Sequence, residues 1–107
     1  MRLEVTLKHI NNPPPTFKEY LEEKLRRLER FDHLVQRVHV VASDEHTHNQ
    51  DTRYVVEAIA HLPRGHEVVA KVAGSCLFEA TDALIDRLEK QVVRIKEQVQ
   101  RHRGRGA

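Results

Sequence analysis

Residues 77–101, LFEATDALIDRLEKQVVRIKEQVQR, decide the fold of this chain. Apolar side chains recur in this stretch every three or four residues, which places them on one face of a helix of period 3.6. The stripe consists of Leu77, Ala80, Thr81, Leu84, Ile85, Leu88, Val92, Ile95 and Val99. A stripe of this length must be covered by a second layer, so the preceding residues have to supply a matching apolar surface.

The polar side of the same predicted helix changes charge along its length. Glu79, Asp82 and Asp86 come first, whereas seven Lys or Arg and only two Glu follow from Arg87 to the end of the chain. Acids near the start and bases near the end suit the helix dipole. The basic excess is larger than that effect requires, so we treat it as a candidate binding surface.

Four segments upstream have the pattern of strands, at residues 2–8, 34–42, 53–62 and 66–73. In the first of them Leu3, Val5 and Leu7 alternate with polar residues and are expected to face the core. The expected core positions of the other three are Val38, Val40, Ala42, Val56, Ala58, Ala60, Val68, Ala70 and Val72. Pro63-Arg64-Gly65 predicts a hairpin turn between the last two strands.

A first helix is predicted over residues 17–31, after the helix-breaking run Pro13-Pro14-Pro15. Thr16 and Glu19 have the spacing of a capping box. The element order is then β-α-β-β-β-α. We predict an α+β, two-layer sandwich: a four-stranded, mostly antiparallel sheet with both helices on one face, similar to a double-stranded-RNA-binding domain.

The 107 residues suit one domain over residues 1–101, followed by a basic, flexible tail at 102–107. We find no segment long and apolar enough to span a membrane and no secretory signal at the N-terminus. A single cysteine, Cys76, has no partner for an internal disulfide. A cytoplasmic protein is therefore expected.

Catalysis has little support in the sequence. It lacks the GxSxG, HExxH and P-loop motifs, and we predict no enzyme, no catalytic residue and no cofactor. His46 and His48 lie near Asp44, Glu45 and Asp51, but a polar loop does not hold metal ligands in fixed geometry, so no metal is expected. Cys76 precedes Leu77 and Phe78, which favours a buried structural thiol.

Basic residues on the two predicted helices are the better functional candidates. Arg87, Lys90, Arg94 and Arg101 share one side of the last helix, and the first helix carries Lys24, Arg26, Arg27 and Arg30. If both helices cover one sheet face, these bases can line a shared groove that holds a phosphate backbone. The alternatives are solvated helices with Lys and Arg paired to Glu, or a general RNA- or protein-interaction module. Duplex RNA is a poorer fit, because the last helix opens with acidic Glu79 and Asp82.

Three motifs resemble one known family. They are YLEEKLRRLERF at residues 20–31, ATDALIDRLEKQVVRIK at residues 80–96, and VEA with LPRG in the hairpin at residues 56–65. They are similar to motifs of the ribosome hibernation-promoting factors, also called ribosome-associated inhibitors or sigma-factor modulation proteins. The chain resembles the short type, without the C-terminal dimerisation domain of the long type.

This resemblance implies a translation inhibitor that binds the small ribosomal subunit. The expected contact is with rRNA in the channel used by messenger and transfer RNA, and the expected effect is to inactivate or protect idle ribosomes under stress or in stationary phase. No small-molecule substrate and no membrane partner is implied. Carried over by position, the rRNA-binding residues are Lys24, Arg27, Arg87, Lys90, Arg94 and Lys96.

Overall fold

The structure is a computed structural model that describes residues 2–10, 13–31, 34–45 and 53–105, with side chains described as far as Gln98. The elements, in chain order, are β1 (Arg2–Lys8), α1 (Phe17–Leu25), the 3-10 helix η1 (Arg26–Phe31), β2 (Arg37–Asp44), β3 (Tyr54–His61), the short 3-10 turn η2 (Pro63–Gly65), β4 (Glu67–Gly74) and α2 (Leu77–Arg105). This is the predicted β-α-β-β-β-α order.

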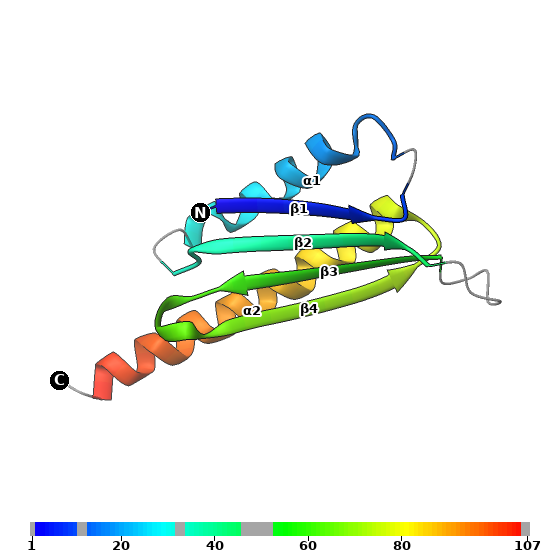
Figure 1. Cartoon of the computed structure of the whole chain (residues 1–107). Helices are drawn as coiled ribbons and strands as arrows, with labels where there is room; N and C mark the ends of the chain where they lie inside the picture. The colour runs from blue at the N-terminus through cyan, green and yellow to red at the C-terminus, as the bar shows by residue number, and fades with distance from the viewer. Residues whose placement is uncertain (1, 11–12, 32–33, 46–52, 106–107) are drawn as a thin grey trace.

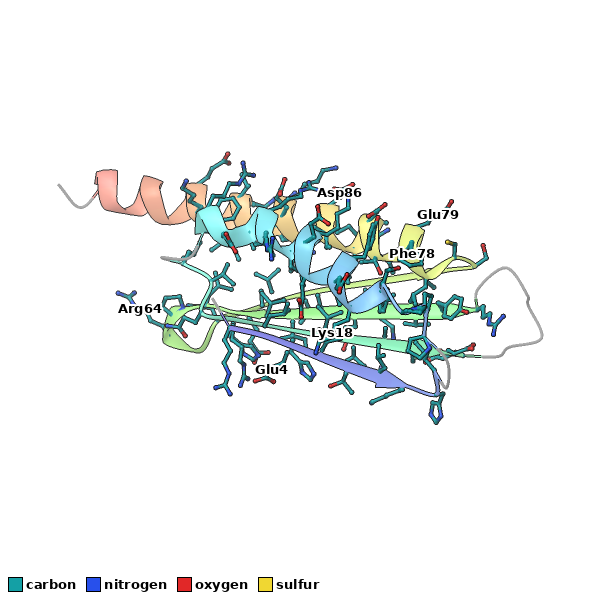
Figure 2. All side chains as sticks on the ribbon, turned by 90° about the horizontal axis from the view of Figure 1, so that it is seen from above. Glu4, Lys18, Arg64, Phe78, Glu79 and Asp86 are labelled. Atoms are coloured by element: carbon teal, nitrogen blue, oxygen red, sulfur yellow. The ribbon has the colours of Figure 1, made fainter. Side chains whose placement is uncertain are left out.

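The four strands form one sheet in the order β1-β2-β3-β4 (Figure 1). β1 is parallel to β2, and the other two pairs are antiparallel. A parallel pair needs a crossover connection, which here contains α1. Both helices cover the same face of the sheet, while Glu4 of β1 points to the opposite face (Figure 2). The predicted two-layer α+β sandwich is therefore confirmed.

The core lies between the helices and the inward side chains of the sheet. One register row crosses all four strands through Val5, Val40, Ala58 and Ala70. The small side chains of Ala58 and Ala70 lie on β3 and β4, the two strands that α2 contacts most extensively. Small residues at such positions allow a helix to approach the sheet closely, so the sequence of the hairpin determines where α2 packs.

The predicted apolar stripe is the buried face of α2. Leu84, Ile85, Leu88 and Val92 have no exposed surface. Thr81 is equally buried, and its hydroxyl donates a 2.8 Å hydrogen bond to the Leu77 carbonyl, which satisfies the one polar group in the stripe. α2 ends at Arg105, four residues beyond the predicted end, so the helix continues into the segment expected to be a tail. Its C-terminal end extends past the β3–β4 hairpin (Figure 1).

Two local expectations about the first half of the chain are wrong. Thr16 makes no side-chain capping bond, because its backbone already has helical angles and the Phe17 N–H is satisfied by the Pro14 carbonyl at 2.9 Å. Leu7 is 37% exposed rather than buried, because β1 is an edge strand and Leu7 lies at its end. None of the helices in the described residues contains an apolar stretch that could cross a membrane.

Candidate nucleic-acid interface

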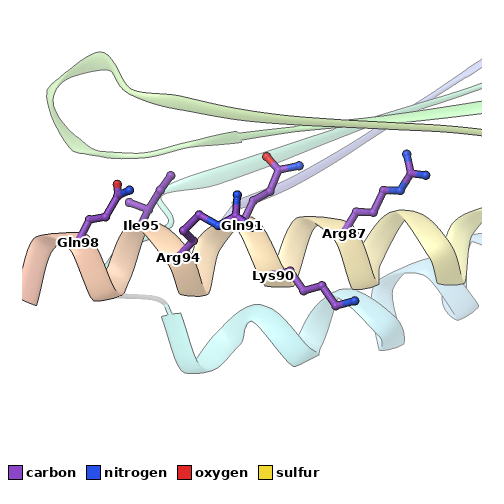
Figure 3. A pocket seen from close by; sticks show the side chains of 6 residues that line it. All are labelled: Arg87, Lys90, Gln91, Arg94, Ile95 and Gln98. Carbon is purple, nitrogen blue, oxygen red and sulfur yellow. The ribbon is translucent and has the colours of Figure 1, made fainter.

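α2 has two polar flanks, one on each side of its buried face. Residues three or four apart on a helix share a side, and this spacing separates the acids from most of the bases. Asp82, Asp86 and Glu89 contact α1 and η1, as the ion pairs below show. The opposite flank contains Arg87, Gln91, Arg94 and Gln98 and lies toward the β3–β4 hairpin (Figure 3).

The flank toward α1 carries a series of ion pairs. The Arg27 guanidinium donates two 3.2 Å hydrogen bonds to Glu89 and lies 3.1 Å from an Asp86 oxygen. Arg30 reaches Glu89 at 3.4 Å, and Lys24 lies 4.0 Å from Asp82. Glu89, and to a lesser extent Asp86, raise the pKa of Arg27, so this guanidinium stays charged.

These pairs contradict the expected groove in which bases of both helices would face each other. Lys24, Arg27 and Arg30 instead pair with Asp82, Asp86 and Glu89, the acids on the flank of α2 that lies against α1 and η1. Lys24 and Arg27 are thus partly neutralised, although their side chains remain 38% and 45% exposed. Lys96 lies at the far end of this flank, with its amino group 5.5 Å from the centre of the Phe31 ring.

The flank toward the hairpin is basic. Arg87 donates a 3.0 Å hydrogen bond to the Lys71 carbonyl on β4, the edge strand of the sheet. Lys90 and Arg94 are exposed, and among the described residues neither has an acidic partner within ion-pair distance. Their charges are therefore available to a ligand, unlike those of Lys24 and Arg27.

A shallow hollow of about 500 Å³, open to solvent, lies along this flank. Its lining consists of Arg87, Lys90, Gln91, Arg94, Ile95 and Gln98, without a single acid (Figure 3). A second, smaller hollow on the same helix includes Glu89 and Glu97 beside Lys90 and Arg94. The first hollow is thus the one suited to an anion.

The structure brings together three of the six predicted rRNA-binding residues, namely Arg87, Lys90 and Arg94. Lys24 of α1 and Arg27 of η1 lie against the other flank of α2, which carries Lys96. Sequence analysis missed the two glutamines of the hollow, although the helical spacing of Gln91 and Gln98 from Arg87 and Arg94 was the signal that could have identified them.

The described residues contain no group of three His, Cys, Asp or Glu arranged to hold a metal ion. His46, His48 and Asp51, which we considered as ligands, lie outside the described residues. Cys76 is a free thiol and is half-buried rather than fully buried, because it lies just before the first turn of α2.

A family profile described as "Sigma 54 modulation protein / S30EA ribosomal protein" matches residues 3–100, nearly the whole chain. The chain belongs to this family. A ribosome hibernation promoting factor of Azotobacter vinelandii is 34% identical over 88 residues, which cover 81% of this chain and 77% of that protein. The protein of the same name from Escherichia coli K12 is 30% identical over 86 residues, covering 79% and 83%.

Two solved structures show the same fold. A ribosomal subunit interface protein from Coxiella burnetii superposes with a TM-score of 0.73 at 22% identity, over 91% of this chain and 99% of that one. The N-terminal domain of Protein Y from Thermus thermophilus superposes with a TM-score of 0.70 at 27% identity, over 89% and 99%. The family is not enzymatic, so the prediction that this chain is no enzyme is confirmed.

Proposed function

We propose that this chain is a ribosome hibernation factor that binds rRNA of the small ribosomal subunit in the channel used by messenger and transfer RNA. Binding there excludes both RNAs, so it inactivates idle ribosomes or protects them under stress or in stationary phase. The observation that carries the proposal is the family match over residues 3–100. A protein with this function acts in the cytoplasm, where ribosomes are.

The charge distribution supports rRNA as the ligand. Arg87 and Arg94 lie on the hairpin-facing flank of α2, Lys90 projects away from that flank (Figure 3), and no acid lines the hollow that all three border. A run of cations without compensating acids attracts a phosphate backbone and releases its counterions on binding. The net charge is only +2, so this local separation of charges matters more than the total.

The six proposed contact residues differ in whether they already have an acidic partner within the protein. Lys90 and Arg94 can bind phosphate without giving up a partner. Lys24 and Arg27 form ion pairs with Asp82, Asp86 and Glu89, which partly neutralise their attraction for phosphate. We therefore assign the main phosphate contacts to Arg87, Lys90 and Arg94, which line the acid-free hollow, and supporting contacts to Lys24, Arg27 and Lys96.

Co-sedimentation with purified small subunits over a range of salt concentrations tests the proposal. Wild-type binding should fall steeply with salt, because each neutralised phosphate adds about 0.7–0.9 to the slope of log K against log salt. The triple variant Arg87→Gln, Lys90→Gln, Arg94→Gln should lower that slope by about 2 and should also relieve inhibition of an in-vitro translation reaction.

A matched control removes three charges from the other face of the protein. Arg2→Gln, Lys8→Gln, Arg37→Gln gives the same net charge but changes β1 and β2 only. It should bind nearly as well as the wild type. If both triple variants bound equally, or if the wild-type chain did not sediment with small subunits at low salt, the proposal would be wrong.

A further inference from the structure

The hairpin-facing flank of α2 alternates cations and amides. Arg87, Gln91, Arg94 and Gln98 follow each other at spacings of four, three and four residues, and all four line the acid-free hollow. One helical turn advances about 5.4 Å, so a cation or an amide is presented at each successive turn. Figure 3 shows Arg87, Gln91 and Gln98 on the side of α2 toward the hairpin, while Lys90 projects away from them.

This row contains glutamine amides, which are not needed to bind phosphate. Arginines alone hold a phosphate backbone, whereas a glutamine amide offers one acceptor and two donors, the groups that pair with the edge of a base. Ile95 lies between the two glutamines along the helix, is half-buried, and packs on the core. It provides a fixed apolar surface on which a base can rest.

Bases are accessible to such a row only when they are unpaired. The major groove of an RNA duplex is too deep and narrow for side chains to read, and its minor groove is recognised mainly by shape and ribose contacts. An exposed helix flank reaches the Watson–Crick edges of bases in single-stranded segments, loops and bulges. The arginines of the row also present flat guanidinium groups suited to stacking.

We propose that the row Arg87–Gln91–Arg94–Gln98 binds a single-stranded RNA segment, with the arginines on phosphates and the glutamines on the edges of unpaired bases. This inference rests on the proposed function, since it names the form of RNA held at the same site. It makes Gln91 and Gln98 the residues that distinguish single-stranded from duplex RNA.

Two synthetic RNAs test the inference directly: a mixed-sequence oligoribonucleotide and the same strand annealed to its complement. In fluorescence anisotropy at low salt, the wild-type chain should prefer the single strand by about tenfold. The double variant Gln91→Ala, Gln98→Ala should lose about tenfold in affinity for the single strand and leave duplex binding and the salt slope unchanged. The control Gln36→Ala, an exposed glutamine before β2, should behave like the wild type.

Chemical probing of base edges on small subunits gives the second readout. Wild type and Gln36→Ala should protect unpaired bases that the double variant leaves reactive. If the duplex bound as tightly as the single strand, or the double variant weakened both RNAs equally, the inference would be overturned while ribosome binding could still hold. If the chain failed to bind subunits but showed glutamine-dependent preference for the single strand, the proposed function would fall and this inference would stand.

Discussion

Tyr20 connects the two helices through a single hydroxyl group. It donates a 2.5 Å hydrogen bond to Asp82 of α2, while its ring packs edge-on against Phe78, with 4.9 Å between ring centres. The hydrogen bond to Asp82, together with burial, raises the pKa of Tyr20 from 10.0 to about 12. Both contacts of Tyr20 therefore depend on the packing of α1 against α2.

This raised pKa predicts a pH-dependent contribution to stability. Below pH 10 the hydroxyl is protonated in both states, and Tyr20→Phe should lower the free energy of unfolding by about 1 kcal/mol. Between pH 10 and 12 the unfolded chain loses the proton first, so the contribution of Tyr20 should decline as pH rises. Urea denaturation of wild type and variant at pH 8 and pH 11 measures the change.

The other tyrosine provides the control for this experiment. Tyr54 lies on β3 and is not hydrogen-bonded to Asp82. At pH 8, Tyr54→Phe should lower the free energy of unfolding by less than Tyr20→Phe does, because it removes no hydrogen bond to Asp82. A Tyr20→Phe variant that differed from wild type by an equal amount at pH 8 and pH 11 would contradict the assignment.

The helix α2 divides its polar residues between two tasks. Asp82, Asp86 and Glu89 pair with bases of α1 and η1, whereas Arg87 and Arg94 line the hollow on the opposite flank. Exposed ion pairs each contribute about 0.2–1 kcal/mol, but Arg27 bonds two acids and shares Glu89 with Arg30. A bidentate arginine in such a network ranks at the upper end of that range.

This division predicts that Arg27 matters more for stability and Arg94 more for binding to small subunits. Arg27→Ala should lower the free energy of unfolding by about 1 kcal/mol, whereas Arg94→Ala should change it by less than about 0.5 kcal/mol. For binding to small subunits, Arg94→Ala should cause the larger loss. Thermal denaturation and co-sedimentation of both variants measure the two rankings, and the same ranking in both assays would show that the flanks are not specialised.

The whole molecule has one core to which both helices and all four strands contribute. Phe17, Leu21 and Leu28 from α1 and η1 belong to the same buried cluster as Leu84 and Leu88 from α2. Helices that share a single core with the sheet cannot unfold without exposing it. The described part of the chain should therefore unfold as one cooperative unit.

Coincident transitions by two probes would confirm this cooperativity. Far-UV circular dichroism follows the helices, and tyrosine fluorescence follows the helix interface through Tyr20 and the sheet through Tyr54. Leu88→Ala, at a position with no exposed surface, should cost about 3 kcal/mol and move both transitions together. Glu79→Ala on the exposed side of α2 is the control and should move neither by more than about 0.5 kcal/mol. Separate transitions for the two probes would contradict a single core.

Much of the fold followed from local patterns. The period of 3.6 identified the buried face of α2, and alternation identified the inward side chains of the three strands after the first helix. All of these strand positions are buried except Val72, which is partly buried. The capping box at Thr16 failed because backbone groups of the preceding turn satisfied the helix start instead. The prediction that Leu7 is buried failed because alternation indicates which face of the sheet a residue is on but not whether another layer covers it.

The sequence alone was sufficient to predict the elements, their order, the two-layer architecture and the family, because these depend on periodicity and on motifs read along the chain. The tertiary structure decided which bases are free. Arg27 and Arg94 look alike in sequence, yet Arg27 pairs with Asp86 and Glu89, whereas Arg94 has no acid within ion-pair distance among the described residues. Periodicity predicts on which side of its helix a residue lies. The charged groups next to that side belong to elements far away in sequence, so periodicity does not predict them. The neighbours of α2, with α1 on one flank and the hairpin on the other, therefore determine which of its charges are paired with an acid.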